Sequence, residues 1–357
     1  MTAVERRPSR MATVAAAAAI AVVAAVLLAG GDEAAVAPAP EPPPLPTTVP
    51  APALVDTTVR LALAGGRDLT VVDLGKGTSA VAPLPDRSGT VSQPPLVTAS
   101  GHTVVVERSV AWSFDREALS LDPRTGGPPV RLGRANTVIP ADRGDVWLVD
   151  FRSDTATAVA PDGSGPRSEP ISLPDGSSWA EPLNVGFLLS SPDRWLHVAR
   201  TGRVLGDRAG SVLASDGDHV VWADAQCPLP ECRVHVTDMA WGTERTFLLS
   251  ATDFTFVNDA GVSPNGRWLA LAGDLVAARS GYEVALVDLG REPLGMAVVA
   301  ASLESPALAL AVDDDWLFWT RRPHGARETT VTAYDIGRRR ATELDLPVAD
   351  VVAFSAF

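Results

Sequence analysis

The sequence predicts an all-β fold, a seven-bladed β-propeller with six or eight blades as alternatives, preceded by an N-terminal transmembrane helix. The main observation is a repeated phrase in which an apolar strand runs into Asp and then into a Gly-marked turn. Copies of this phrase begin at Asp73, Asp122, Asp162, Asp207, Asp238, Asp288 and Asp335. They lie about 44 residues apart on average, a step that is typical of propeller blades made of several short strands.

The composition agrees with many short strands joined by turns. The 357 residues include 29 Gly and 30 Pro, which are frequent in turns and rare inside helices. The formal net charge of −13 repels a phosphate backbone, so we expect no nucleic acid partner. The one clear basic run, residues 338–340, follows the turn after Asp335 and is interpreted as a solvated hairpin.

The N-terminus has the pattern of a membrane-targeting segment. Arg6, Arg7 and Arg10 precede an uncharged run from Met11 to Gly30, whose length suits a bilayer-spanning helix and whose basic flank should stay in the cytoplasm. Because ten of these twenty residues are Ala, a cleaved secretory signal that releases the protein stays open as the alternative. The high content of Ala, Arg and Gly is of the actinobacterial type.

A proline-rich stretch follows the apolar run. Residues 34–53 contain eight prolines, a density that favours extended polyproline conformations over helix or sheet. We interpret this stretch as a semi-rigid spacer that holds a folded domain away from the bilayer. The expected parts are a cytoplasmic basic tail (1–10), a transmembrane signal-anchor helix (11–30), a proline-rich linker (31–54) and an extracytoplasmic propeller (55–357).

The chain has two cysteines, Cys227 and Cys232, with four residues between them. In an oxidising compartment, a lone close pair is typical of a disulfide that closes a small loop. His219 and His235 flank the pair, but the spacing is not that of a zinc site. We therefore expect a disulfide between Cys227 and Cys232, no metal ion and no cofactor.

The first blade lacks one strand, which predicts how the ring closes. Val59–Ala64, Leu69–Asp73 and Ser79–Pro83 supply three strands, and only the linker precedes them. The apolar C-terminal segment Val351–Phe357 is left over after the last blade. We expect it to insert as the innermost strand of the first blade, because closure removes two free sheet edges. The fourth blade, from about residue 184 to residue 207, is the least regular.

Most tryptophans are expected in second strands, where large rings fill the wedge between adjacent blades. These core candidates are Trp147, Trp195, Trp222, Trp268, Trp316 and Trp319. Three others fit this register less well and are candidates for exposed contact residues, namely Trp112, Trp179 and Trp241.

Two segments carry a family resemblance. Ser263-Pro264-Asn265-Gly266-Arg267, followed by an apolar strand, resembles the strand-turn-strand phrase of TolB-like and related WD-type propeller repeats. Ser191-Pro192-Asp193-Arg194 is a shortened copy without the Gly. Pro fixes φ at the start of such a turn and Gly takes a positive φ, between the first and second strands of a blade. The resemblance implies a propeller in the cell envelope, and it transfers no binding residues.

No catalytic residues are predicted. The sequence has no Gly-x-Ser-x-Gly nucleophile motif, which a serine hydrolase of the α/β type needs. The five histidines are scattered along the chain. Asp313, Asp314 and Asp315 form the densest carboxylate cluster, and we interpret it as an exposed acidic turn rather than a calcium site, because no Asp-x-Asp-x-Asp-Gly loop is present.

The expected function is therefore non-catalytic. A rigid disc with two loop-bearing faces suits a binding or scaffold role, with a protein or glycan of the cell envelope as partner and the membrane contacted through the N-terminal helix. The alternative is an envelope carbohydrate-active enzyme, a lyase or hydrolase with its site in the axial channel. A structural subunit of a membrane complex is a third hypothesis. Carboxylates, His and Arg that converge in a deep channel pocket would favour the enzyme.

Overall fold

The computed structural model describes most of the C-terminal part of the chain. The described residues are 47–54, 57–64, 68–84, 97–100, 103–109, 116–121, 127–141, 144–177, 179–184, 186–191, 194–225, 232–248, 254–275, 282–291, 295–303, 307–321, 329–346 and 353–356. Their regular elements are all strands, and they include no helix long and apolar enough to cross a membrane. The expected anchor helix, residues 11–30, lies outside the described residues.

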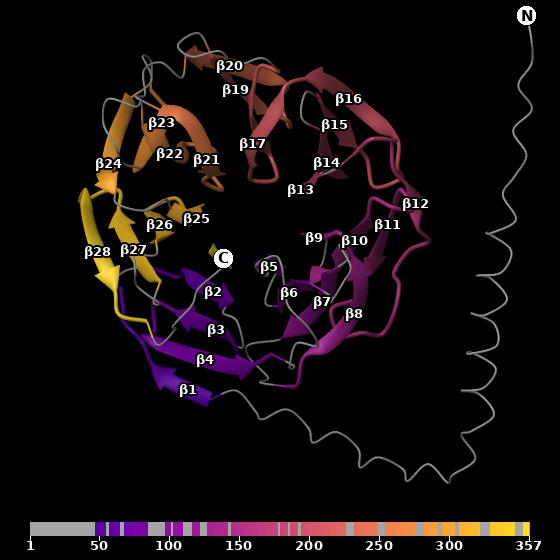
Figure 1. The fold of residues 1–357 in the computed structure, drawn as a ribbon, viewed down its shortest axis with the longest axis horizontal. Helices are drawn as coiled ribbons and strands as arrows, with labels where there is room; N and C mark the ends of the chain where they lie inside the picture. The colour runs from indigo at the N-terminus through magenta and orange to yellow at the C-terminus, as the bar shows by residue number, and fades with distance from the viewer. Residues whose placement is uncertain are drawn as a thin grey trace, which may run out of the picture. The chain divides into compact units, whose positions relative to one another are not determined.

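The strands form four-stranded antiparallel meanders around a central axis (Figure 1). From the axis outward, six sheets contain β5 (Val97–Ser100), β6 (Thr103–Ser109), β7 (Arg116–Leu121) and β8 (Val130–Ala135); β9 (Thr137–Pro140), β10 (Val146–Asp150), β11 (Thr155–Val159) and β12 (Ile171–Ser172); β13 (Trp179–Leu183), β14 (Gly186–Ser191), β15 (Arg194–Val198) and β16 (Val204–Ala209); β17 (Ser211–Ser215), β18 (His219–Ala223), β19 (Arg233–Asp238) and β20 (Thr243–Leu248); β21 (Phe254–Val262), β22 (Trp268–Leu275), β23 (Tyr282–Asp288) and β24 (Gly295–Leu303); β25 (Ala307–Val312), β26 (Trp316–Arg321), β27 (Thr330–Asp335) and β28 (Arg340–Leu344). The prediction of an all-β propeller is confirmed.

The remaining sheet contains strands from both ends of the chain. Its order is β1–β4–β3–β2–β29, with β1 (Thr47–Pro50), β4 (Thr78–Pro83), β3 (Asp68–Asp73), β2 (Arg60–Ala64) and β29 (Ala353–Ala356). The C-terminal strand β29 pairs antiparallel with β2, Leu61 opposite Ala356 and Ala64 opposite Ala353. The predicted closure of the ring by the C-terminal strand is therefore confirmed, and β2 has a partner on each side.

The linker boundary expected at residue 54 differs from the structure. Thr47–Pro50 pairs with β4 from Thr47 opposite Val81 to Pro50 opposite Thr78, as a fifth, outermost strand. Ala51 and Leu54 pack against the core of the same sheet. A proline-containing segment can form this strand because an edge strand needs hydrogen bonds on one side only. The propeller thus includes residues 47–54, which the proline content alone had assigned to the linker.

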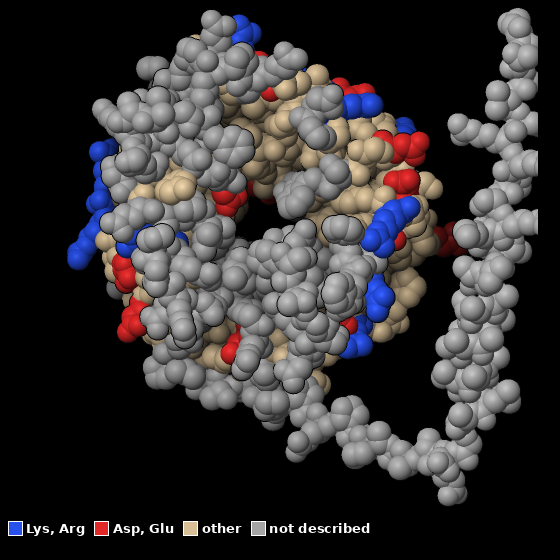
Figure 2. Space-filling model, viewed as in Figure 1, with Lys and Arg blue, Asp and Glu red and all other residues tan. Residues whose placement is uncertain are grey.

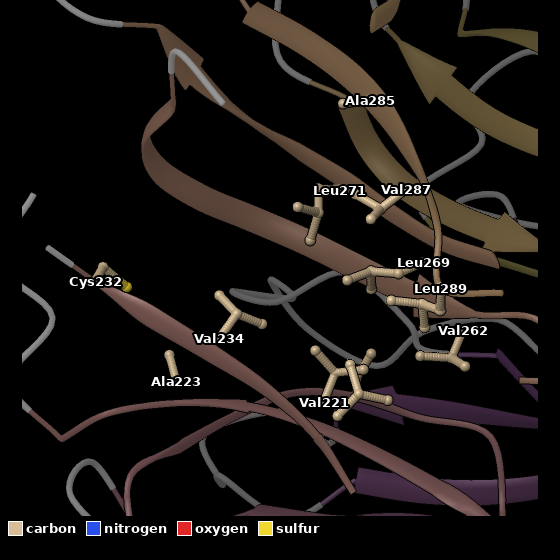
Figure 3. Packing of buried hydrophobic residues seen from close by; sticks show 12 residues of the cluster. Val221, Ala223, Cys232, Val234, Val262, Leu269, Leu271, Ala285, Val287 and Leu289 are labelled. Carbon is tan, nitrogen blue, oxygen red and sulfur yellow. The ribbon is translucent and has the colours of Figure 1, made fainter. Parts of the chain in front are cut away.

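The core lies between adjacent sheets, so the middle strands are buried on both faces. In β18 and β23, nearly every residue is buried, which explains why they appear in the sequence as continuous apolar runs rather than alternating ones. Figure 3 shows one such layer, in which Val221 and Val234 face Leu269 and Val287 of the next sheet. By contrast, the outer strands β16 and β20 are largely exposed.

The tryptophans mostly follow the prediction. Five of the six core candidates are buried, and the sixth, Trp268, packs at the edge of a core cluster; the buried ones are Trp147, Trp195, Trp222, Trp316 and Trp319. However, Trp195 lies in the third strand of its sheet, β15, and not in a second strand. The reason is that this sheet begins at Trp179, earlier than expected, and is a regular four-stranded meander.

Candidate binding site

The repeated Asp forms the turn between the third and fourth strands of a sheet. Asp73, Asp238, Asp288 and Asp335 each end a third strand. Each carboxylate accepts a hydrogen bond from a backbone N–H two or three residues ahead, at 2.7–3.0 Å. This local bond stabilises the tight turn and explains the repeat. Asp207 differs, because it lies inside β16, and Asp122 lies outside the described residues.

These carboxylates also bind cations at the start of the second strand. Arg60 lies 3.5 Å from Asp73, and Arg267 lies 3.3 Å from Asp288. Burial alone would raise the pKa of Asp288, but hydrogen bonds from Arg267 and Gly290 lower it below its ordinary value. The repeat is therefore a structural corner of the sheet and not a ligand site.

His219 occupies the same corner in its own sheet. Its Nδ1 lies 2.9 Å from Asp216 Oδ2, and its Nε2 lies 3.9 Å from Asp238. The hydrogen bond with Asp216 raises the pKa of His219 above its ordinary value, although burial acts in the opposite direction. Gly266 of the next sheet, at φ 65°, packs so closely that any side chain there would overlap the His219 ring.

Short turns on this side of the disc are linked from sheet to sheet. We call it the turn face; it carries the connections between first and second strands and between third and fourth strands. Asn184 N–H donates to Gly217 O at 2.8 Å, and Asn265 N–H donates to Asp314 Oδ1 at 3.1 Å. The predicted Ser263–Gly266 turn joins first and second strands as expected, and Gly266 N–H donates to Ser263 O at 2.8 Å. Its turns stabilise one another, so this part of the turn face is structural.

A second polar network joins two sheets near the rim. His235 stacks on Trp222 with ring centroids 4.0 Å apart. Its Nε2 lies 3.0 Å from Asp224 Oδ1, and its Nδ1 lies 3.2 Å from Glu244 Oε1. Arg208 reaches from β16 to Glu244 at 3.0 Å. Since each of these polar groups has a protein partner, the network serves to hold the sheets together.

The opposite side, which we call the loop face, carries the second-to-third and fourth-to-first connections, and it holds an open cleft of about 590 Å³. The cleft lies on sheet β13–β16, beneath the connection that leads from β12 to β13. Its lining comprises Asp175, Gly176, Ser177, Leu189, Ser190, Ser191, Arg194, Leu196, Asp207 and Ala209. This volume is within the range of roughly 300–1,000 Å³ that small-molecule sites occupy.

An ion pair forms one wall of the cleft. Arg194 Nε donates to Asp207 Oδ1 at 2.7 Å, and Arg194 Nη2 donates to Asp207 Oδ2 at 2.6 Å. Such a two-point pair fixes both side chains in one plane. Arg194 belongs to the shortened Ser-Pro-Asp-Arg copy, which joins the second and third strands, β14 and β15, and not the first and second as predicted. The sequence thus marked this segment as a turn but not as part of a site.

The innermost strands carry little ionisable chemistry. The described strands β5, β9, β13, β17, β21, β25 and β29 contain two ionisable residues, Glu181 and Asp259. Burial raises the pKa of Asp259 to about 6, against hydrogen bonds from the backbone of Ala260 and Leu310. Leu310 belongs to the next sheet, so this carboxylate joins two inner strands. The described part of these strands shows no convergence of carboxylates, His and Arg.

The residues nominated from the sequence have different outcomes. Cys232 is buried at 3% exposure next to Val234, and Cys227 lies outside the described residues. Trp241 is 82% exposed on its turn, as expected of a contact residue; Trp112 and the Trp179 side chain lie outside the description. Asp313–Asp315 form the predicted turn between β25 and β26. Within the described ranges, no three His, Cys, Asp or Glu residues are grouped to hold a metal ion.

Charge is spread over the surface of the described domain. In the view of Figure 2, acidic and basic side chains lie next to one another along the rim. The ion pairs agree with this, since Arg131 pairs with Glu117 at 2.9 Å and Arg338 with Asp335 at 3.0 Å. The net charge of −13 is therefore not gathered in one patch of the described surface in this view.

Comparisons with known proteins support the fold and do not identify a family. No protein-family model matches the sequence, and no curated protein sequence matches it. A candidate 6-phosphogluconolactonase from Bacteroides uniformis is 15% identical over 84% of this chain and 100% of its own, with a TM-score of 0.55. One from Bacteroides fragilis is 14% identical over 86% of this chain and 99% of its own, with a TM-score of 0.53. TolB from Acinetobacter baumannii is 11% identical over 83% of this chain and 66% of its own, with a TM-score of 0.46.

At such low identity, similar structures show the fold and not the activity. The domain is a β-propeller, and TolB is among the proteins to which its fold is similar.

Proposed function

We propose that the chain is a non-catalytic binding or scaffold propeller of the cell envelope, with a protein or glycan as its partner. In this proposal each sheet is one blade of a seven-bladed ring. An uncleaved helix at residues 11–30 holds the ring outside the cytoplasmic membrane; a secreted form after signal cleavage is the alternative. A disulfide between Cys227 and Cys232 closes the loop that follows β18, in agreement with the lack of a free cysteine among the described residues.

The observation that carries the proposal is the open cleft of mixed polar and apolar lining on the loop face. It lies on a rigid sheet, where a bound ligand would meet fixed side chains, and rigid scaffolds with such clefts suit recognition. The inner strands, where an axial catalytic site would have to lie, supply Glu181 and Asp259 as their ionisable side chains. A single pair of carboxyl groups gives little support to a multi-residue catalytic site.

One observation favours the enzyme as the second candidate. The pKa of Asp259 near 6 would suit a general acid, because an acid works best when its pKa is close to the working pH. If envelope carbohydrate is cleaved by the purified protein, Asp259→Asn should abolish the cleavage.

The test uses the full chain in lipid nanodiscs, incubated with fractionated envelope protein and envelope glycan. Saturable binding of one fraction, with the ligand recovered chemically unchanged by mass spectrometry, would support the proposal. Recovery of a cleaved ligand would replace it with the enzyme, and the absence of binding to both fractions would refute it. Protease protection in sealed vesicles tests the orientation, and N-terminal sequencing of the mature protein tests the cleavage.

A further inference from the structure

The cleft on the loop face combines features that fit one chemical class of ligand, an inference that rests on the proposed binding function. Leu189 and Leu196 contribute apolar surface from neighbouring strands, β14 and β15, and they lie directly opposite each other in the register. Hydroxyl groups of Ser177, Ser190 and Ser191 surround this apolar surface. A pyranose ring has the complementary pattern, with C–H groups on its faces and hydroxyl groups around its edge.

The ion pair supplies acceptors in fixed positions. Each Asp207 oxygen accepts one hydrogen bond from Arg194, and a carboxylate has about four acceptor sites. Asp207 can therefore accept further hydrogen bonds from a ligand while its pair with Arg194 remains intact. Because the pair already holds the carboxylate in place, a ligand loses little free energy to ordering it.

The local charge selects among saccharides. Asp175 and Asp207 contribute two negative charges and Arg194 one positive charge, so these three residues carry a net charge of −1. A phosphate or uronate group placed here would meet like charge at short range, which is unfavourable in a partly desolvated site. A hydroxyl, an N-acetyl group or an ammonium group would not.

We infer that this cleft binds a short saccharide that is neutral or amine-bearing. Its volume of about 590 Å³ limits the bound part to a few sugar rings, either a free oligosaccharide or the end of a longer chain.

The test is calorimetric titration of the full chain in detergent with four defined tetrasaccharides: cellotetraose, chitotetraose, its deacetylated amine form and tetragalacturonate. We expect saturable binding to at least one of the first three, with tetragalacturonate at least tenfold weaker. Asp207→Asn keeps the side-chain shape and removes the charge, so it should weaken binding at least fivefold. Arg194→Gln, as a second variant, should do the same because it frees Asp207 from its fixed position.

The matched control is Arg131→Gln, which breaks another exposed ion pair, that with Glu117 at 2.9 Å, far from the cleft in sequence. It should leave the affinity unchanged, and the Tm of all variants should stay close to that of the parent, since exposed pairs contribute about 0–1 kcal/mol. Lack of binding to all four probes, tighter binding of tetragalacturonate, or unchanged affinity in both cleft variants would overturn the inference. If the nanodisc experiment then detects an envelope protein partner, the proposed binding function would stand without this ligand.

Discussion

Replacing Asp259 with Asn should change how the stability of the propeller depends on pH. Burial raises the pKa of Asp259 to about 6 from 3.8, so the folded state favours the protonated carboxyl. The contribution of this group to stability is therefore greatest below pH 3.8 and is lost as the pH rises through about 6. Each pKa unit corresponds to about 1.4 kcal/mol, which makes the full loss at most about 3 kcal/mol.

Roughly 2 kcal/mol of that loss should fall between pH 4.5 and pH 7.5. Asn cannot ionise, so the Asp259→Asn protein should gain about this amount relative to the parent over the same pH interval. The partial exposure of Asp259 to water makes this an upper bound.

The assay is urea unfolding of the full chain in detergent, followed by tryptophan fluorescence, at pH 4.5, 6.0 and 7.5. Asp345→Asn, the same exchange at an exposed site, is the control and should change the free energy of unfolding by no more than about 0.5 kcal/mol at each pH. A free-energy difference between Asp259→Asn and the parent that is the same at all three pH values would refute the reasoning.

Three further predictions follow from the described contacts. Ending the chain at Pro347 removes β29 and leaves β2 with a free edge, so the Tm of the whole domain should fall in a single transition, whereas removing only Phe357, beyond β29, should change it little; a loss confined to local fraying would contradict ring closure. His219→Gln should destabilise the domain more at pH 5.5 than at pH 8.5, because the raised pKa of His219 makes its stabilisation complete below about pH 6.5 and lost as the pH rises through the folded-state value; equal destabilisation at both pH values in urea melts would exclude the Asp216 pairing as its source. Trp195→Ala should cost about 3–5 kcal/mol, while the exposed Trp241→Ala should cost less than about 0.5 kcal/mol, and similar losses for both in denaturant unfolding would show that the assignment of core and surface is wrong.

The repeat could be predicted from the sequence because its cause is local. The Asp carboxylate of each third strand bonds to backbone atoms two or three residues away, so a fixed residue pattern accompanies a fixed turn. Closure by the C-terminal strand was also predictable, because one blade had three strands and an apolar segment was left over. These inferences needed only strand counting and turn chemistry.

The cleft could not be predicted in the same way. Arg194 and Asp207 are 13 residues apart, and their pairing depends on the register between β15 and β16, which contains an irregularity at His197 and Val198. The strand β1 was missed for a related reason. Its prolines argue against a central strand, but its place depends on an unpaired edge of β4 that no local pattern reveals.

The two ends of the propeller chain lie at opposite edges of one sheet, with β1 outermost and β29 innermost. A mechanical pull on the N-terminal side of β1 would act first on its four-residue ladder with β4. Peeling that ladder would lengthen the tether by a few residues while the inner ladder between β29 and β2 kept the circle shut. The arrangement would let the molecule yield under load at its periphery before it lost its shape.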